Sequence, residues 1–318
     1  MNLYPLKLKH ACSTAIWGGN RLSDVWGKES NISPLAETWE LACRDDGMMS
    51  RIENGEFAGL TLDEYIKAVG TAVVSDKYDG GRFPLLIKFI DAAADLSVQV
   101  HPDDGYASRV ENDSGKTEMW YIVEAEPGAM IVCGLADGVG CEDFREAVRK
   151  NEYEKVLRYV EVKPGETYFI PSGLAHAIGK GILIAEIQQN SDLTYRIYDY
   201  GRLGADGKPR QLHVEQAMQV VRPFTDEEIG GIRYSRGERE GYLANSKYFA
   251  VFEAELEGTV EAFADKGSFQ CVLSVSGEGE IAWDGGVYSF KKGDCIFVPA
   301  GMGSYTLRGV GKVLISTL

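Results

Sequence analysis

A short segment with alternating residues places three polar side chains on one face of a predicted strand. In DLSVQVHPDD (95–104), Ser97, Gln99 and His101 alternate with Leu and Val, so they point to the same side. If the apolar side packs against another layer, this polar side lines an interior, where each unpaired polar group costs about 1–3 kcal/mol. A metal ion bound by the imidazole and the amide oxygen would remove that cost.

Two further segments supply a carboxylate and a second imidazole. Glu118 lies in GKTEMWYI on the same predicted strand face as Lys116, and His176 follows the Pro-x-Gly turn of PSGLAHAIG. Imidazole and carboxylate groups favour Zn²⁺, Fe²⁺ or a similar ion over Ca²⁺ or Mg²⁺. The predicted metal ligands are Gln99, His101, Glu118 and His176.

Other charged residues are candidates for acid–base chemistry and for binding an anion. In the segment 182–190, Glu186 lies on a strand face that we expect to line the same cavity. There it is either a general base or part of a structural ion pair, and its spacing does not distinguish the two. The groups that would bind a phosphate are Lys88, Lys116, Arg196 and the hydroxyl of Ser97, although surface solvation is the alternative for each charge. The sequence contains no glycine-rich phosphate loop, which argues against a nucleotide cofactor.

An internal repeat predicts the architecture that positions these residues. KPGETYFIPSGLAHAI matches KKGDCIFVPAGMGSYTL at an offset of 128 residues, and EMWYIVEAEPGAMIVCG matches QCVLSVSGEGEIAWDGG at an offset of 152. Short alternating strands bounded by Gly and Pro are typical of jelly-roll barrels. We therefore predict a mainly β chain with two cupin-type barrels and a few peripheral helices. The 24-residue difference between the offsets is assigned to a helix over residues 142–158.

The two copies of the repeat differ in their metal ligands. The second copy has Gln270 in the place of Glu118 and Ser304 in the place of His176, so we expect it to bind no metal. The predicted domains are residues 1–221, a metal-binding catalytic barrel with N-terminal strands and inserted helices, and residues 222–318, a degenerate barrel.

Composition excludes several classes of partner. With 33 Lys and Arg against 48 Asp and Glu, the net charge is −15, and a field of that sign repels nucleic acids and anionic membranes. No segment approaches the roughly 18 apolar residues needed to span a bilayer, and the first residues lack the apolar region of a signal peptide. We expect a cytoplasmic protein that binds neither nucleic acid nor membrane, as a monomer or weak homo-oligomer.

The segments quoted above, together with IWGGNRL (16–22), ETWEL (37–41), PLLIKFIDAAADLSVQVHPDD (84–104) and QQNSDLTYRIYDYGR (188–202), extend over nearly the whole chain. They closely resemble the type I mannose-6-phosphate isomerase (phosphomannose isomerase) family in its short bacterial form. The resemblance implies a cupin enzyme with one zinc ion per chain, which interconverts mannose 6-phosphate and fructose 6-phosphate. It implies zinc ligands at Gln99, His101, Glu118 and His176, and a substrate pocket lined by Ser97, Lys88, Lys116, Glu186 and Arg196.

For that reaction we predict proton transfer between C1 and C2 through a cis-enediol. Glu186 is the candidate base, and Lys116 and Arg196 are further candidate catalytic residues, Arg196 also as a phosphate ligand. Two alternatives stay open: a cupin Fe²⁺ oxygenase and a cupin that binds a sugar without catalysis. Gln99 argues mildly against the oxygenase, because such enzymes more often use two histidines and one carboxylate alone.

Overall fold

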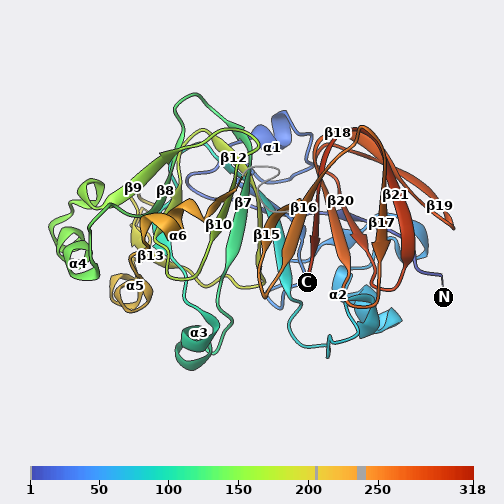
Figure 1. The fold of residues 1–318 in the computed structure, drawn as a ribbon, viewed down its shortest axis with the longest axis horizontal. Helices are drawn as coiled ribbons and strands as arrows, with labels where there is room; N and C mark the ends of the chain where they lie inside the picture. The colour runs from blue at the N-terminus through green and yellow to red at the C-terminus, as the bar shows by residue number, and fades with distance from the viewer. Residues whose placement is uncertain (1, 205–206, 235–240) are drawn as a thin grey trace.

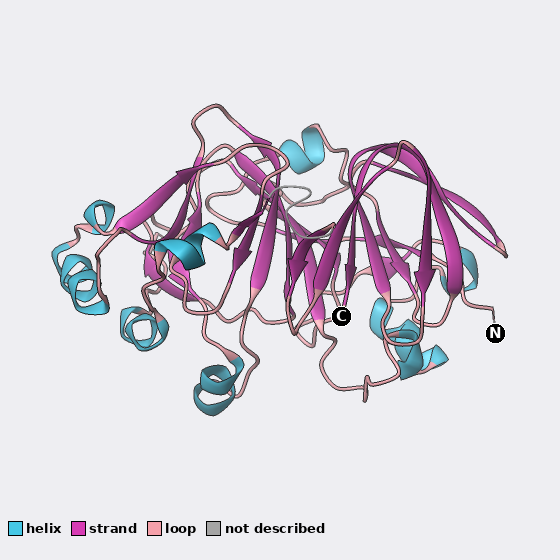
Figure 2. Cartoon of the chain, viewed as in Figure 1, coloured by secondary structure: helices cyan, strands magenta, loops and turns pink. Residues whose placement is uncertain are grey.

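The computed structural model describes residues 2–204, 207–234 and 241–318. Its strands form two barrels that lie side by side, with the helices at the periphery (Figures 1 and 2). The strand pairs of all three sheets are antiparallel. The prediction of a mainly β chain with few helices is confirmed.

The N-terminal barrel consists of two sheets with a shared core. The seven-stranded sheet has the order β14 (Arg233–Tyr234), β10 (Thr167–Ile170), β7 (Glu118–Ala125), β12 (Ile182–Gln189), β5 (Leu85–Ala92), β3 (Glu37–Leu41) and β2 (Ala11–Ser13). The five-stranded sheet has the order β13 (Tyr195–Tyr198), β6 (Val98–Val100), β11 (His176–Ile178), β8 (Met130–Leu135) and β9 (Leu157–Glu161). Residues such as Trp120 and Ile184 of the first sheet share an apolar cluster with Ile131 and Ile178 of the second, so this cluster joins the two sheets.

The second barrel is built on a nine-stranded sheet. Its main path is β15 (Tyr242–Asn245), β16 (Ala250–Glu255), β21 (Gly303–Thr317), β18 (Gln270–Trp283), β20 (Cys295–Val298), β1 (Leu6–Lys9) and β4 (Arg51–Ile52), with β17 (Gly258–Ala264) beside β21 and β19 (Gly286–Lys291) beside β18. Strands β1 and β4 thus belong to the first part of the sequence but to the sheet of the second. The boundary at residues 221 and 222 stays a prediction.

The central strands of the seven-stranded sheet are buried on both faces, which explains their nearly continuous apolar sequences. All eight residues of β5 and all eight of β12 are buried. One face packs toward the five-stranded sheet, while Ile87 and Phe89 on the other face join a cluster with Phe269 and Phe297 of the second barrel. The two barrels are therefore held together by a shared apolar core.

The internal repeat is visible in the strand register. Ile170 pairs with Glu118 in the first barrel, and Val298 pairs with Gln270 in the second. These pairs are related by the two offsets found in the sequence. The interior of the second barrel is filled by apolar side chains, among them Phe290.

The helices lie outside the sheets (Figure 2). They are α1 (Arg21–Asp24), α2 (Leu62–Val69), α3 (Asp104–Val110), α4 (Cys141–Lys150), α5 (Val214–Val220) and α6 (Asp226–Gly230), with 3-10 turns at Gly55–Phe57, Thr71–Val73 and Tyr153–Lys155. The predicted helix over 142–158 is correct for α4 but wrong beyond it, because Asn151 adopts the left-handed conformation and ends the helix. None of the helices in the described chain has the length and apolar composition needed to cross a membrane.

Replacement of Phe297 by Ala should test the core shared by the barrels. Phe297 is fully buried, and its ring stacks on Phe269 with 5.0 Å between centroids. We expect Phe297→Ala to lower the free energy of unfolding by about 3–5 kcal/mol, measured by chemical denaturation. The control is Phe263→Ala, since Phe263 is 61% exposed and its loss should change little. Equal denaturation midpoints for the two variants would contradict this packing.

Candidate metal centre

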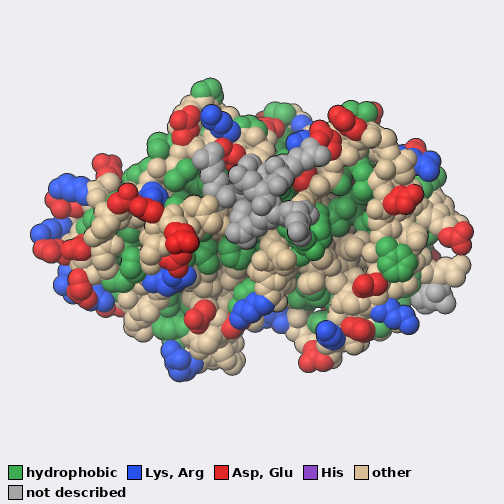
Figure 3. Space-filling view, viewed as in Figure 1, with side chains coloured by type: hydrophobic (Ala, Val, Ile, Leu, Met, Phe, Trp, Pro, Cys, Tyr) green, Lys and Arg blue, Asp and Glu red, His purple; other side chains and the backbone are tan. Residues whose placement is uncertain are grey.

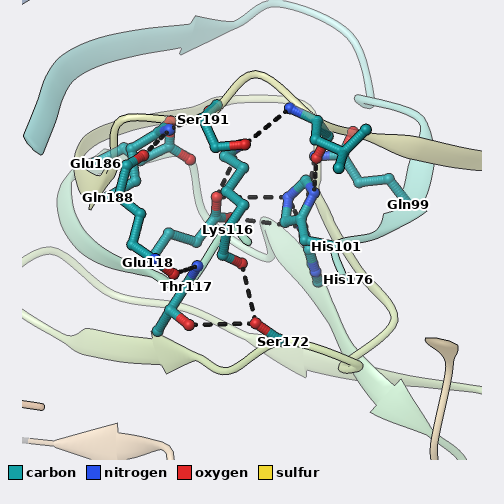
Figure 4. Close-up of polar contacts among 12 residues, drawn as sticks. Gln99, His101, Lys116, Thr117, Glu118, Ser172, His176, Glu186, Gln188 and Ser191 are labelled. Carbon is teal, nitrogen blue, oxygen red and sulfur yellow. Dashed lines mark hydrogen bonds and ion pairs between the residues drawn. The ribbon is translucent and has the colours of Figure 1, made fainter. Parts of the chain in front are cut away.

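Three of the predicted ligands converge between the two N-terminal sheets. His101 follows β6 and His176 begins β11, whereas Glu118 begins β7 on the opposite sheet. One ligand atom from each lies within 4.8 Å of the others, and the three side chains are almost completely buried. Each Nε2 atom is 3.5 Å from an oxygen of Glu118, and Figure 4 shows the imidazoles side by side.

The hydrogen bonds of the two Nδ1 atoms determine which ring nitrogens face the centre. Nδ1 of His101 lies 2.9 Å from the carbonyl oxygen of Leu193, and Nδ1 of His176 lies 2.8 Å from that of Leu174. Because a carbonyl only accepts, each Nδ1 donates a proton and each Nε2 keeps a lone pair. These two Nε2 atoms are 3.1 Å apart and face the Glu118 carboxylate. Three such acceptors fit around a cation, and this donor set suits zinc.

The protonation states agree with metal binding. Burial, helped by the charge of Lys116, lowers the pKa of His101 to about 3, and burial also lowers the pKa of His176. For Glu118, burial alone would raise the pKa, but Lys116 and the two imidazoles hold it well below its usual value. Neutral imidazoles and an ionised carboxylate are the forms that bind metals.

Gln99 lies next to these three residues, opposite His176 in the strand register. Its Nε2 atom is 3.4 Å from Nε2 of His176. A half-turn of the amide exchanges its nitrogen and oxygen, and the oxygen would then face the centre. The role of Gln99 as a fourth ligand stays a prediction.

A cavity of about 180 Å³ lies beside the centre, with Gln99 in its wall. All five predicted pocket residues line it: Ser97, Lys88, Lys116, Glu186 and Arg196. The sequence analysis did not single out several other lining residues, including Trp17, Glu37, Asp192, Thr194 and Arg210. A larger cavity of about 780 Å³, lined by Arg44 and Asp63 among others, contains none of the predicted site residues. The smaller cavity is therefore the candidate site because of the residues that line it, and not because of its volume.

Hydrogen bonds and an ion pair connect the residues of the cavity to the metal centre. The strand register places Glu186 between Trp120 of β7 and Lys88 of β5. The indole N–H of Trp120 donates to Glu118 at 3.0 Å and to Glu186 at 3.1 Å, while Lys116 lies 2.9 Å from Glu118. Trp120 was missed in the sequence, although its two-residue spacing from Glu118 places both on one strand face.

Glu186 has the electrostatic environment of a neutral-pH base. Burial and the nearby charge of Glu118 raise the pKa of Glu186 to about 7. Its contact with Lys88 is long, at 3.8 Å, and Lys88 lies closer to Glu37, at 3.4 Å. The nitrogen of Lys88 also lies 4.4 Å from the ring centre of Trp39. Within the described residues, the ion pair recorded for Glu186 is therefore this long contact with Lys88, and its role as a general base stays a prediction.

The second barrel has a different interior at the matching positions. The hydroxyl of Tyr305 donates to the side-chain oxygen of Gln270 at 2.6 Å, and Ser304 is exposed. Within the described ranges, the only cluster of three or more potential metal-ligand side chains is the one in the first barrel. On the face of the molecule shown in Figure 3, acidic and basic side chains are interspersed, and no described histidine is visible.

Comparisons with known proteins agree along the whole chain. Residues 5–133 match the model of the phosphomannose isomerase type I catalytic domain, and residues 239–318 match that of the mannose-6-phosphate isomerase cupin domain. Mannose-6-phosphate isomerase ManA of Bacillus subtilis is 38% identical over 100% of both chains, and a mannose-6-phosphate isomerase of Streptococcus mutans is 34% identical over 98% of each. The crystal structure of the mannose 6-phosphate isomerase from Bacillus subtilis is similar with a TM-score of 0.87, at 33% identity over 99% of each chain.

Fold and site together define a cupin protein with a buried metal site in its first barrel. The full-length matches identify its relatives more closely. The chain belongs to the type I mannose-6-phosphate isomerase family.

Loss of one imidazole should remove the metal. We expect His101→Ala to lose bound divalent metal, because two of the three converging groups bind weakly without the third. Elemental analysis of the purified protein measures this, and added zinc should raise the melting temperature of the parent protein but not of the variant. His10→Ala is the control, since His10 lies outside the cluster and should keep full metal content. Unchanged metal content in His101→Ala would remove the ligand assignment.

Proposed function

We propose that this protein is a zinc-dependent mannose-6-phosphate isomerase that interconverts mannose 6-phosphate and fructose 6-phosphate. The observation that carries this proposal is a metal-ligand set that lies beside a cavity lined by the buried side chains of Lys116, Glu186 and Lys88. Full-length relatives that carry the name of this activity support it. We infer that residues 1–221 are the catalytic part and that residues 222–318 form a barrel without metal ligands.

Zinc is the ion that we propose, one per chain. Two imidazoles and a carboxylate suit it, and a mannose 6-phosphate isomerase of the same fold, 17% identical with a TM-score of 0.78, has a crystal structure bound with zinc and yttrium. The ligands in this proposal are Gln99, His101, Glu118 and His176. When bound, zinc would supply Lewis-acid polarisation of the sugar oxygens.

Glu186 is the proposed base for proton transfer. It would remove the C2 proton of the open-chain aldose and return a proton at C1. The hydroxyl proton of O2 would pass to O1 through the cis-enediol, so that C1 gains a hydroxyl group and C2 becomes the carbonyl carbon of the ketose. A carboxylate with a pKa near 7 both accepts and donates a proton at neutral pH. The hydrogen bond from Trp120 fixes its orientation relative to Glu118.

Lys116 is proposed to stabilise the negative charge that develops on the sugar oxygens. Burial would lower the pKa of Lys116, but Glu118 and Glu186 raise it above its usual value, so its ammonium stays charged. Loss of one such stabilising group typically costs about 10²–10³ in rate.

Arg196 is the proposed phosphate ligand and a proposed catalytic residue that stabilises developing charge. Ser97 and Lys88, which line the same cavity, are proposed to bind the phosphate with it. The Nε atom of Arg196 donates to the hydroxyl of Ser97 at 3.3 Å, and Nη1 donates to the carbonyl of Gln211 at 2.8 Å. Among the described residues, no carboxylate lies within ion-pair distance of Arg196, so its charge is available to an anion.

An anaerobic assay tests the proposal against its two alternatives. We expect the zinc-loaded protein to convert mannose 6-phosphate into fructose 6-phosphate in the absence of oxygen. A coupled enzymatic assay that consumes fructose 6-phosphate measures the product. Oxygen consumption linked to turnover would favour an Fe²⁺ oxygenase. Binding of the sugar phosphate without turnover would favour a sugar-binding cupin, and either result would contradict the isomerase.

A conservative replacement tests the base. We expect Glu186→Gln to keep its zinc, because Glu186 is outside the ligand set, and to lose turnover by about 10²–10⁴-fold. Zinc analysis and steady-state kinetics measure the two effects, with Glu215→Gln on the exposed side of α5 as a matched control. Near-normal turnover of Glu186→Gln would move the base role to another group.

A further inference from the structure

A second arginine lies in the wall of the cavity and is held there by a buried carboxylate. Arg210 lines the same cavity as Arg196, although the two are separated by a loop that follows β13. The carboxylate of Asp199, which is 4% exposed, accepts from Nε of Arg210 at 2.7 Å and from Nη2 at 2.5 Å. Two parallel hydrogen bonds of this kind fix the plane of a guanidinium.

Basic side chains outnumber acidic ones in the described part of this segment, residues 196–204 and 207–210. Arg202 also donates to Asp199, at 2.5 Å, so one carboxylate serves two arginines while Arg196 has no ion-pair partner among the described residues. Arg196 and Arg210 line the same cavity, and burial and the charges of Arg210 and Arg202 lower the pKa of Arg196, although Asp199 raises it. In a chain with a net charge of −15, a cavity lined by four basic side chains against the acidic Glu37, Glu186 and Asp192 favours an anion.

A left-handed residue lies next to the carboxylate that binds the two arginines. Tyr200, directly after Asp199, has a φ of 57°, a conformation that a bulky side chain rarely adopts. The guanidinium of Arg202 lies 5.0 Å from the centre of its ring. This turn allows Arg202 and Arg210 to bind the same carboxylate from different points of the loop.

We propose that Arg210 is a substrate-binding residue that contacts the phosphate together with Arg196, and that Asp199 is the positioning residue that holds it. The inference rests on the proposed function, because the phosphate belongs to the proposed substrate. It adds the reason for selectivity: two guanidiniums at one cavity bind a dianionic phosphate, so a hexose 6-phosphate is preferred over the free hexose.

The chain provides a matched pair of variants. Arg210→Gln and Arg202→Gln each remove a hydrogen bond to the same oxygen of Asp199 at the same length, but of the two residues only Arg210 lines the cavity. We expect Arg210→Gln to raise KM for mannose 6-phosphate, and the dissociation constant of inorganic phosphate, by about tenfold or more. Arg202→Gln should change neither value more than about twofold.

The positioning role of Asp199 has its own readout. Asp199→Asn keeps both arginines but weakens their anchoring, so KM for mannose 6-phosphate should rise while kcat changes little. Arg210→Lys keeps the charge without the two parallel bonds and should give an intermediate KM. If Arg210→Gln does not fold, the Lys variant serves in its place.

Phosphate binding, measured by calorimetry on the zinc-loaded protein, separates failure of this inference from failure of the proposed function. The inference would be overturned if Arg210→Gln bound phosphate as tightly as the parent protein. Where the Gln variant does not fold, the same result for Arg210→Lys would overturn it. Equal losses of phosphate affinity in Arg210→Gln and Arg202→Gln would also overturn it. A parent protein that binds phosphate through Arg210 but does not isomerise mannose 6-phosphate would instead overturn the proposed function.

Discussion

Two imidazole nitrogens and a carboxylate face one another, buried between the two N-terminal sheets. The Nδ1 atoms of His101 and His176 donate hydrogen bonds to backbone carbonyls. Moving the proton of either ring to Nε2 would therefore cost a buried hydrogen bond. Lone pairs and negative charge in such a place are costly unless a cation compensates them. Lys116 already pairs with Glu118, and a metal ion would in addition satisfy the lone pairs of the two imidazoles. The three side chains therefore form a site that a metal ion would complete, provided that the two sheets keep their spacing.

The charged groups around the centre are arranged about Glu118. Glu118 interacts at once with the imidazoles, with Lys116 and with the indole of Trp120, so its position links the metal to the cavity. Trp120 extends this link to Glu186, whose burial near another carboxylate gives it a pKa suited to proton transfer. At the cavity wall formed by the loop after β13, arginines provide positive charge. The proposed base and the proposed anion-binding group thus line one small cavity beside the candidate metal site.

Local patterns in the sequence predicted the parts of this arrangement that depend on strand geometry. Alternation placed Ser97, Gln99 and His101 on one face, and the internal repeat identified matching strands in the correct register. The end of α4 was misjudged because a left-handed Asn151 interrupts an otherwise helical pattern. Arg210 could not be found from spacing, because only the folded loop brings it to Asp199 and the cavity. Similarly, the pairing of β1 and β4 with the second barrel depends on long-range contacts that alternation does not encode.

Anomalous X-ray diffraction at the zinc edge, on crystals of zinc-loaded protein, tests the central claim most directly. The account predicts one strong peak per chain, about 2.0–2.2 Å from Nε2 of His101, Nε2 of His176 and an oxygen of Glu118. A peak in the second barrel, or none between these three side chains, would contradict it.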